Sequence, residues 1–235
     1  GPNASGKTNF LESIFYASVL QAFPPSKSWE LIGFVADYFR LEVTTDEHIL
    51  TYYYGRKGEK RFERSQTIDG VRKKAAEVMG VVATVSFLPQ DLNLLQFSPS
   101  SRREYLDEIL LQTEDSYEDV LSEYTRVVTQ RNELLSRVNF GQAQASELDI
   151  WDEQLVRLAS RIVAARSGLA QHMARDLREV YRTLTGATLD IEFVYAPTGK
   201  DMSEESLRDE LFKRRHEDIG SGRTSVGPHR DDWRI

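Results

Sequence analysis

The chain of 235 residues contains no cysteine, and this absence excludes several kinds of site. Without cysteine there can be no disulfide, no thiolate metal site and no cysteine nucleophile. A long apolar run is also missing, because the longest one, residues 81–88, is too short to cross a bilayer. No targeting segment is visible. We therefore expect a cytoplasmic protein with no membrane partner, and we interpret residues 81–88 as a buried strand.

Positive charge is scarce overall but concentrated in one segment. The chain has 30 Lys and Arg against 37 Asp and Glu, a net charge of −7, which argues against a uniformly basic nucleic-acid-binding surface. Residues 56–74 nevertheless hold eight basic and three acidic residues, whereas residues 104–124 hold eight acidic residues and no Lys or Arg. The basic block is a candidate contact for a nucleic-acid backbone, and a solvated hairpin is the alternative. The candidate DNA-binding residues in this block are Lys57, Lys60, Arg61, Arg64, Arg72, Lys73 and Lys74.

The strongest motif is Gly-x4-Gly-Lys-Thr, which occupies residues 1–8. In a phosphate-binding loop of this spacing, backbone N–H groups curl around a phosphate, glycines permit the curl, and the next helix contributes its positive end. Lys7 would reach the β- and γ-phosphates, and the Thr8 hydroxyl would bind Mg²⁺. The predicted residues for ATP and Mg²⁺ are Gly1, Pro2, Asn3, Ala4, Ser5, Gly6, Lys7, Thr8 and Asn9.

A chance match to this motif is the alternative, and the residues that follow argue against it. Apolar side chains after the loop recur at intervals of three and four, which predicts the half-buried helix that a phosphate-binding loop requires. The positions on its apolar face are Phe10, Leu11, Ile14, Phe15, Ser18 and Val19.

Residues 38–89 carry a β-strand pattern. Alternation over 39–43, β-branched and aromatic residues over 49–54, and the turn dipeptide Asp69-Gly70 predict antiparallel strands. A short helix over 72–79 is expected to lead into the buried strand that begins at Val81. A helix after a phosphate loop, followed by strands, indicates an α/β ATPase core with an antiparallel subsheet.

Helical spacing begins near Ser98-Pro99 and continues almost unbroken to Leu184. Within it the apolar intervals alternate four and three over 117–138 and over 148–169, as in coiled-coil seams. Gly141 lies between the two seams and lets the chain reverse. The sequence therefore predicts an antiparallel helical hairpin with Arg131 as the one polar seam position. The seam residues are Tyr117, Leu121, Tyr124, Val128, Arg131, Leu135 and Val138, followed by Leu148, Trp151, Leu155, Leu158, Ile162, Ala165 and Leu169.

The β-like pattern returns after this hairpin. Residues 189–195 alternate as a strand, and residues 203–218 predict a charged helix that begins at Ser203. Strands on both sides of the helices indicate that the hairpin is inserted into the ATPase core. We expect residues 1–97 to form the first part of the core, 98–186 the helical lid, and 187–235 the resumed core.

Four blocks of residues, in order along nearly the whole chain, resemble the RecF family of bacterial recombination-repair ATPases of the ABC/SMC class. The first is the loop at residues 1–9, and the second is Phe87-Leu88-Pro89-Gln90-Asp91-Leu92 with the segment 98–107. The third comprises residues 151–155 and 161–166, and the fourth is 226–232. The family usually has an acidic residue in place of Gln90 and a small residue in place of Phe97. By similarity to ABC-type ATPases, Gln90 is a candidate metal-contacting and catalytic residue beside Lys7.

The resemblance implies an α/β ABC/SMC-type ATPase head with an inserted helical lid, which binds ATP·Mg²⁺ and DNA in DNA repair, replication and recombination. It also implies slow DNA-stimulated hydrolysis by an ATP-dependent homodimer near single-strand/double-strand junctions, in cooperation with RecR and the RecO/RecA pathway that places RecA on gapped DNA. The family's first strand would precede Gly1, and its signature motif and Mg²⁺-holding acidic pair would follow Ile235. We therefore expect residues 1–235 alone to be inactive as an ATPase.

Two other interpretations of the same motifs stay open. One is another SMC-like or overcoming-lysogenization-type ATPase, which would carry a long coiled coil or a nuclease domain. The other is a non-hydrolysing, ATP-gated DNA clamp or scaffold, which would lack the acidic pair.

Three polar clusters have a structural as well as a functional interpretation. His229 lies beside Asp231 and Asp232, but consecutive strand residues point to opposite faces, which favours a structural or nucleotide-proximal role over a metal site. The run 213–216, Lys213-Arg214-Arg215-His216, is expected to be a solvated helix face rather than a DNA site.

Arg102 and Arg103 form the third cluster. They are candidates for contact with phosphate or DNA, and the alternative is ion pairing with Glu104 and Asp107 on the helix surface. The family pattern keeps both arginines, which favours the contact.

Overall fold

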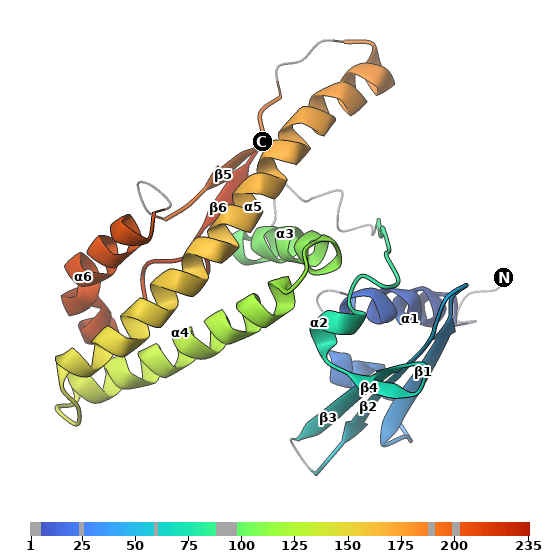
Figure 1. Ribbon diagram of the computed structural model, residues 1–235, viewed down its shortest axis with the longest axis horizontal. Helices are drawn as coiled ribbons and strands as arrows, with labels where there is room; N and C mark the ends of the chain where they lie inside the picture. The colour runs from blue at the N-terminus through green and yellow to red at the C-terminus, as the bar shows by residue number, and fades with distance from the viewer. Residues whose placement is uncertain (1–5, 24–25, 59–60, 88–97, 188–190, 199–202) are drawn as a thin grey trace. The chain divides into compact units, whose positions relative to one another are not determined.

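A computed structural model describes residues 6–23, 26–58, 61–87, 98–187, 191–198 and 203–235 (Figure 1). The chain divides into two compact units, one of residues 1–89 with 111–115 and the other of residues 90–110 with 116–235. The expected division at residues 97 and 186 stays a prediction. In the structure, however, the helical hairpin and the segment after it belong to the same unit.

The first unit contains an antiparallel sheet in which every strand pairs with its neighbour in sequence. The strands are β1 (Tyr38–Thr44), β2 (Ile49–Arg56), β3 (Phe62–Ile68) and β4 (Val71–Lys73), in the order β1-β2-β3-β4. Asp69 and Gly70 both have positive φ, 52° and 79°, and they form the predicted two-residue turn between β3 and β4. Among the described residues of 6–87, the helical segments are α1 (Lys7–Val19), the 3₁₀ turn η1 (Ser28–Leu31) and α2 (Ala75–Val78). The helix expected over 72–79 is therefore shorter, since residues 72 and 73 pair in β4 instead.

The C-terminal half of α1 packs on one face of this sheet. Tyr16 contacts Phe39 and Tyr52 edge-on, and the Tyr52 hydroxyl donates a hydrogen bond of 2.8 Å to the carbonyl of Ala17. Burial raises the pKa of Tyr52 to about 12, so that its hydroxyl stays a donor. The buried cluster comprises Tyr16, Ala17, Leu20, Leu50, Tyr52, Ala75 and Val78.

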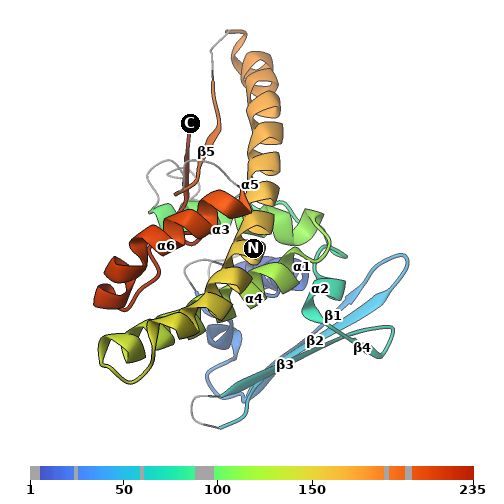
Figure 2. The same ribbon diagram turned by 60° about the vertical axis from the view of Figure 1, so that its left-hand side comes forward.

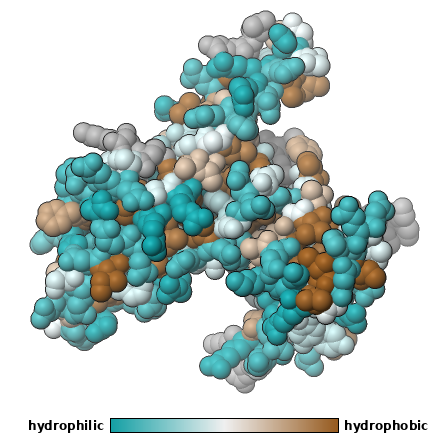
Figure 3. Space-filling model, viewed as in Figure 1, coloured by the Kyte–Doolittle hydropathy of each residue, from teal (hydrophilic) through white to brown (hydrophobic). Residues whose placement is uncertain are grey.

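The predicted apolar face of α1 is only partly correct. Phe15, Ser18 and Val19 are buried, but Phe10 and Leu11 are 67% and 58% exposed. Only the helix from Phe15 onward reaches the sheet, so the first two turns contribute hydrophobic surface to the outside of this unit. Figure 3 shows hydrophobic side chains at the surface of the molecule.

The buried strand expected at residues 81–88 is wrong for residues 81–87, which form no strand. Val85 and Phe87 are exposed, and the segment is held by a side chain, because the N–H of Thr84 donates to Oε1 of Gln112 at 2.8 Å. The same oxygen accepts a hydrogen bond of 2.7 Å from the Ser18 hydroxyl. An extended segment becomes a strand only where a neighbour shares its backbone hydrogen bonds, and none of the described residues does so here.

The second unit is built on the predicted helical hairpin (Figure 2). Its helices are α4 (Tyr117–Asn139) and α5 (Leu148–Thr185), joined through the 3₁₀ turn η3 (Ala145–Glu147), and Gly141 has the expected positive φ of 69°. The helix before them, α3 (Pro99–Thr113), ends short of Ser116, whose φ of 63° breaks the helical run that had been expected to continue. The seam is confirmed in outline, although Val120 and Val127 are buried where Leu121 and Val128 had been expected.

The segment after the hairpin packs on it. Helix α6 (Glu204–Ser221) begins as predicted, since the Ser203 hydroxyl accepts a hydrogen bond from the N–H of Ser206. Strands β5 (Val194–Ala196) and β6 (Asp232–Arg234) pair with each other. Of the strand expected over 189–195, residues 189 and 190 lie outside the described part of the chain, residues 191–193 form no strand, and only residues 194–196 pair with β6.

Arg131 is buried in the hairpin, but it is not the one polar seam residue that had been expected. Its Nε donates to Asp152 at 2.7 Å, and its Nη1 donates to Asp218 at 2.8 Å and to Thr224 at 2.9 Å. Arg166 and Asp152 on α5 are buried as well. These contacts join α4, α5 and α6 through charge rather than through apolar packing alone.

Candidate nucleotide-binding site and the arginine motif

The end of the phosphate-loop motif forms the first turn of α1. Gly6 caps the helix with a φ of 81°, a left-handed conformation that favours glycine, and Lys7 and Thr8 follow it as exposed residues. The first turn contains no acidic residue and no side-chain cap. A helix end of this kind offers backbone N–H groups and positive potential to an anion.

The remaining predicted nucleotide-site residues lie outside the described part of the chain. These are Gly1 to Ser5 of the loop and Gln90, whereas Asn9 continues α1 directly after Thr8. The donor set that the structure does describe, the helix end with Lys7 and Thr8, fits a phosphate group with its metal ion.

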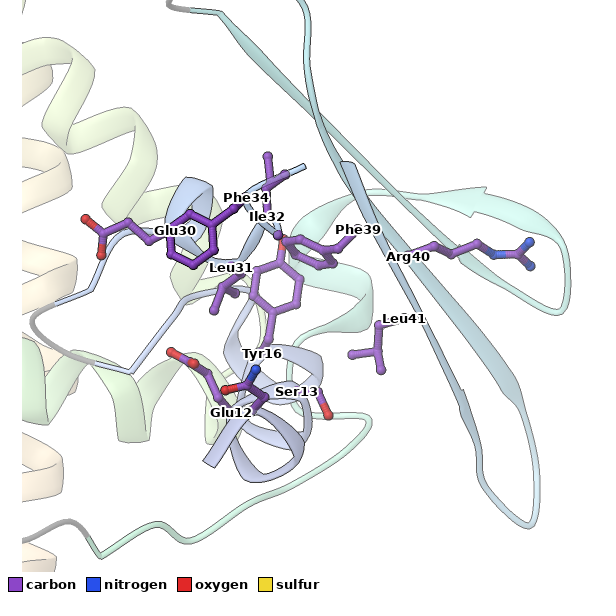
Figure 4. A pocket seen from close by; sticks show the side chains of 12 residues that line it. Glu12, Ser13, Tyr16, Glu30, Leu31, Ile32, Phe34, Phe39, Arg40 and Leu41 are labelled. Atoms are coloured by element: carbon purple, nitrogen blue, oxygen red, sulfur yellow. The ribbon is translucent and has the colours of Figure 1, made fainter. Parts of the chain in front are cut away.

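A cavity of about 400 Å³ lies beside α1, and sequence reasoning did not find it (Figure 4). Residues from α1, from the segment around η1 and from β1 line it. The charged groups at its edge are already engaged: Glu12 accepts a hydrogen bond from the N–H of Phe23, and Arg40 pairs with Glu42 at 3.0 Å. The aromatic and aliphatic lining is therefore suited to apolar contact more than to holding charge. The lining residues are Asn9, Glu12, Ser13, Tyr16, Glu30, Leu31, Ile32, Gly33, Phe34, Phe39, Arg40 and Leu41.

The basic block does not occupy one face of the sheet. Arg64 lies opposite Tyr54 on β2, on the face that α1 covers, whereas Arg72 lies opposite Thr67 on the other face. Lys57 pairs with Glu63 and Lys73 with Glu77, both at 3.1 Å, while Lys60 lies outside the described residues. Arg61 and Lys74 are exposed. A DNA contact by these residues stays a prediction.

Arg102 and Arg103 meet the Gly227–Asp232 motif rather than their helical neighbours. Arg102 donates through Nε to Asp232 at 2.8 Å and also binds the second oxygen of that carboxylate, and Nη1 of Arg103 donates to the carbonyl of Asp231 at 2.8 Å. The alternative, in which these arginines pair with Glu104 and Asp107, is therefore wrong, because their partners are Asp232 and the carbonyl of Asp231. Asp107 is occupied by Arg166, which binds both of its oxygens.

His229 is a structural residue in this arrangement. The Tyr124 hydroxyl donates to its Nδ1 at 2.6 Å, and its Nε2 donates to the carbonyl of Thr224 at 3.0 Å. Burial lowers the pKa of His229 and raises the pKa of Tyr124, which keeps both side chains neutral in these bonds. Asp231 accepts hydrogen bonds from Tyr195 and Thr198. Among the described residues, no group of three or more His, Asp or Glu could hold a metal ion.

The run 213–216 on α6 is a solvated face only in part. Lys213 and Arg214 pair with Glu210 on their own helix, as expected for a surface. Arg215 is instead partly buried, and it binds Asp149 and Asp152 on α5. It belongs to the charged contact between α5 and α6.

Gly227 allows the close approach on which the Tyr124–His229 bond depends. Its φ is 127°, and a Cβ placed there would lie 2.5 Å from the Tyr124 hydroxyl. We expect Gly227→Ala to lower the free energy of unfolding by about 2–4 kcal/mol, through backbone strain and displacement of Tyr124. Gly168→Ala, inside α5, is the matched control, because a Cβ placed there would have no atom within 4 Å apart from the adjacent residues and the backbone of its own helix; it should stabilise by about 0.5–1 kcal/mol. Urea denaturation measures the unfolding midpoints of both variants. Equal midpoints for Gly227→Ala and Gly168→Ala would contradict the role given to Gly227.

Among the described residues, no helix is long and apolar enough to span a membrane. No family model matches the chain. Curated relatives named DNA replication and repair protein RecF do match it: that of Heliobacterium modesticaldum is 38% identical over 243 residues and covers 100% of the chain, and that of Lachnospira eligens is 33% identical over 235 residues and covers 99%. The chain spans 65% and 64% of the length of these two relatives.

Two solved structures share the fold along nearly the whole chain. One is the recombination mediator protein RecF-ATPrS of the RecFOR pathway, with a TM-score of 0.86, 27% identity, and coverage of 99% of this chain and 65% of that one. The other is RecF-ATP of the same pathway, with a TM-score of 0.86, 26% identity, and coverage of 98% and 64%. This chain therefore belongs to the RecF family and has the α/β fold of an ABC/SMC-type P-loop ATPase.

Proposed function

We propose that the chain is the ATP-binding part of a RecF protein that acts on DNA in replication and recombinational repair. The observation that carries the proposal is the Gly-x4-Gly-Lys-Thr motif, whose last residues form the exposed first turn of α1. Its relatives are named as replication and repair proteins, and one similar structure is RecF-ATP.

In this proposal each part of the motif has its own task. Backbone N–H groups of residues 1–8, except Pro2, which has none, surround the phosphates, and Lys7 adds a positive charge at the β- and γ-phosphates. The Thr8 hydroxyl holds Mg²⁺, which neutralises phosphate charge when it is bound, and Gln90 is proposed as a second contact to the metal and to water. Gly6 supplies the left-handed backbone conformation at the N-cap, where the loop joins α1.

At the level of the whole protein, we propose an ATP-dependent homodimer that recognises single-strand/double-strand junctions and helps to load RecA together with RecR and RecO. The basis for these partners is family membership and the RecFOR pathway to which the similar structures belong. Hydrolysis is proposed to be slow and stimulated by DNA. A dimer that forms with ATP but never hydrolyses it would favour the ATP-gated clamp instead.

The basic block supplies a test of DNA binding. Each phosphate that a basic residue neutralises contributes nearly one unit to the slope of log affinity against log salt, so replacing Lys60, Arg61 and Arg64 with Ala should flatten that slope by up to about three units. Fluorescence anisotropy of a labelled gapped duplex, with ATP·Mg²⁺ at several salt concentrations, measures it. The matched control is Lys213→Ala with Arg214→Ala, which removes cations paired with Glu210 and should keep the parental slope. A parental slope in the triple variant would place the DNA contact elsewhere.

A further inference from the structure

A small pocket of about 170 Å³ lies in the second unit, between the first turns of α3, the start of α4 and the middle of α5. It is formed by side chains of α3, α4 and α5 together with the Pro228-His229 segment. Its charged and titratable lining residues are Arg103, Glu104, Asp107, Tyr124, Arg166 and His229. The pocket thus brings two guanidinium groups to one space.

Most polar groups in this pocket are already occupied. Arg166 is buried and donates to both oxygens of Asp107, at 2.9 and 2.8 Å, and to the carbonyl of Pro228 at 2.7 Å. Asp107 also accepts a hydrogen bond of 2.6 Å from Tyr117. Both ring nitrogens of His229 are engaged with Tyr124 and Thr224. The charge of Arg166 is therefore balanced within the protein.

Arg103 differs from these groups. Its guanidinium makes one hydrogen bond, from Nη1 to the carbonyl of Asp231, and it forms no ion pair with any described residue. It is half-buried, and burial together with the neighbouring charge of Arg166 lowers its pKa, against the opposing effect of the nearby carboxylates of Asp231, Asp232 and Asp107. A cation that is partly removed from water and has no carboxylate in hydrogen-bond contact is stabilised by an incoming anion.

We propose that this pocket binds a phosphate group, with the guanidinium donors of Arg103 that make no other hydrogen bond as its principal contact. The planar guanidinium donates in the fork geometry that matches a phosphate. The pocket has room for one phosphate group, and its lining residues belong to a different unit from α1. The phosphate comes either from a nucleic-acid backbone or from a free phosphate compound.

Glu104 distinguishes phosphate binding from a purely structural role of Arg103, because its removal should change phosphate affinity in the opposite direction. Its exposed carboxylate lines the same pocket and would repel a bound phosphate. Removing that charge should tighten phosphate binding, whereas removing Arg103 should weaken it.

The experiment uses the chain with Lys7→Ala, so that the phosphate loop contributes little. Two probes are titrated: inorganic phosphate, followed by isothermal calorimetry, and a labelled single-stranded oligonucleotide without a terminal phosphate, followed by anisotropy. We expect Arg103→Gln to weaken binding about tenfold or more and Glu104→Gln to strengthen it severalfold, while Arg208→Gln, which removes an exposed arginine paired with Glu153, changes nothing.

The two probes identify the source of the phosphate. Effects on the oligonucleotide alone indicate a nucleic-acid backbone, and effects on inorganic phosphate alone indicate a free phosphate compound. Equal affinities of Arg103→Gln and the parent for both probes would overturn the proposal. If Arg103→Gln does not fold, Glu104→Gln decides, because unchanged or weaker binding in that variant is incompatible with a phosphate beside its carboxylate.

Discussion

Replacing Arg131 with Met is expected to lower the free energy of unfolding of the hairpin unit by about 3–5 kcal/mol. The Arg131 side chain has no exposed surface and lies between two carboxylates, those of Asp152 and Asp218. If the whole charged network were replaced by apolar residues of similar size, the free energy of unfolding would change little. Removing only the cation, however, leaves buried negative charge without compensation, and that charge is costly.

The two carboxylates should not respond equally to this change. Asp152 keeps an ion pair with Arg215, whereas Asp218 keeps only hydrogen bonds, among them the one from the N–H of Ser225. Adding Asp218→Asn to Arg131→Met should therefore recover more stability than adding Asp152→Asn. Urea denaturation followed by circular dichroism compares these variants.

Arg208→Met is the matched control for Arg131→Met. Arg208 forms a similar ion pair with Glu153 at 2.6 Å, but both side chains are about half exposed. Exposed pairs contribute roughly 0–1 kcal/mol, so this variant should stay close to the parent. A similar, small loss in both variants would show that burial of the Arg131 network does not matter for stability.

Local patterns in the sequence predicted the parts of the fold that local chemistry determines. Asp69-Gly70 specifies a two-residue turn because both positions need positive φ, and Ser203 specifies a helix start because its side chain accepts from the first turn. Gly141 and the alternating seam likewise predicted the hairpin. In each case the residues that decide the structure are only a few positions apart.

Partners distant in sequence could not be predicted in this way. Arg102 and Asp232 are 130 residues apart, and Arg131 and Asp218 are 87 apart, so no spacing rule connects them. For Arg102 and Arg103 the sequence favoured contact with phosphate or DNA, and it offered only their helical neighbours Glu104 and Asp107 as alternative partners. Segment 81–87 failed for a related reason, because strand formation depends on a neighbouring strand and not on apolar composition alone.

The candidate nucleotide site was predicted almost entirely from the motif. The structure adds that Gly6 has positive φ and that Lys7 and Thr8 form an exposed helix end without acidic residues. The cavity beside α1 carries no sequence motif. The pocket at Arg103 draws on three of the motif blocks, residues 98–107, 161–166 and 226–232, but only the fold shows that these blocks meet.

The largest functional effect is expected from Lys7→Ala. Its ammonium group would make charge-assisted hydrogen bonds to phosphate oxygens, and each bond of this kind contributes about 1.5–3 kcal/mol. Losing it should weaken ATP binding by roughly ten- to a hundredfold or more. Thr8→Ala should remove the Mg²⁺ dependence of ATP affinity, while Thr8→Ser, which keeps the hydroxyl, should preserve it.

The most direct test of ATP binding at the start of α1 is an equilibrium titration of the chain with a fluorescent ATP analogue and Mg²⁺. The parent chain and Thr8→Ser should saturate with similar affinity, and Lys7→Ala and Thr8→Ala should bind far more weakly while keeping the parental unfolding midpoint. Saturation of Lys7→Ala at the parental affinity would contradict the assignment of residues 1–8 as the nucleotide-binding loop.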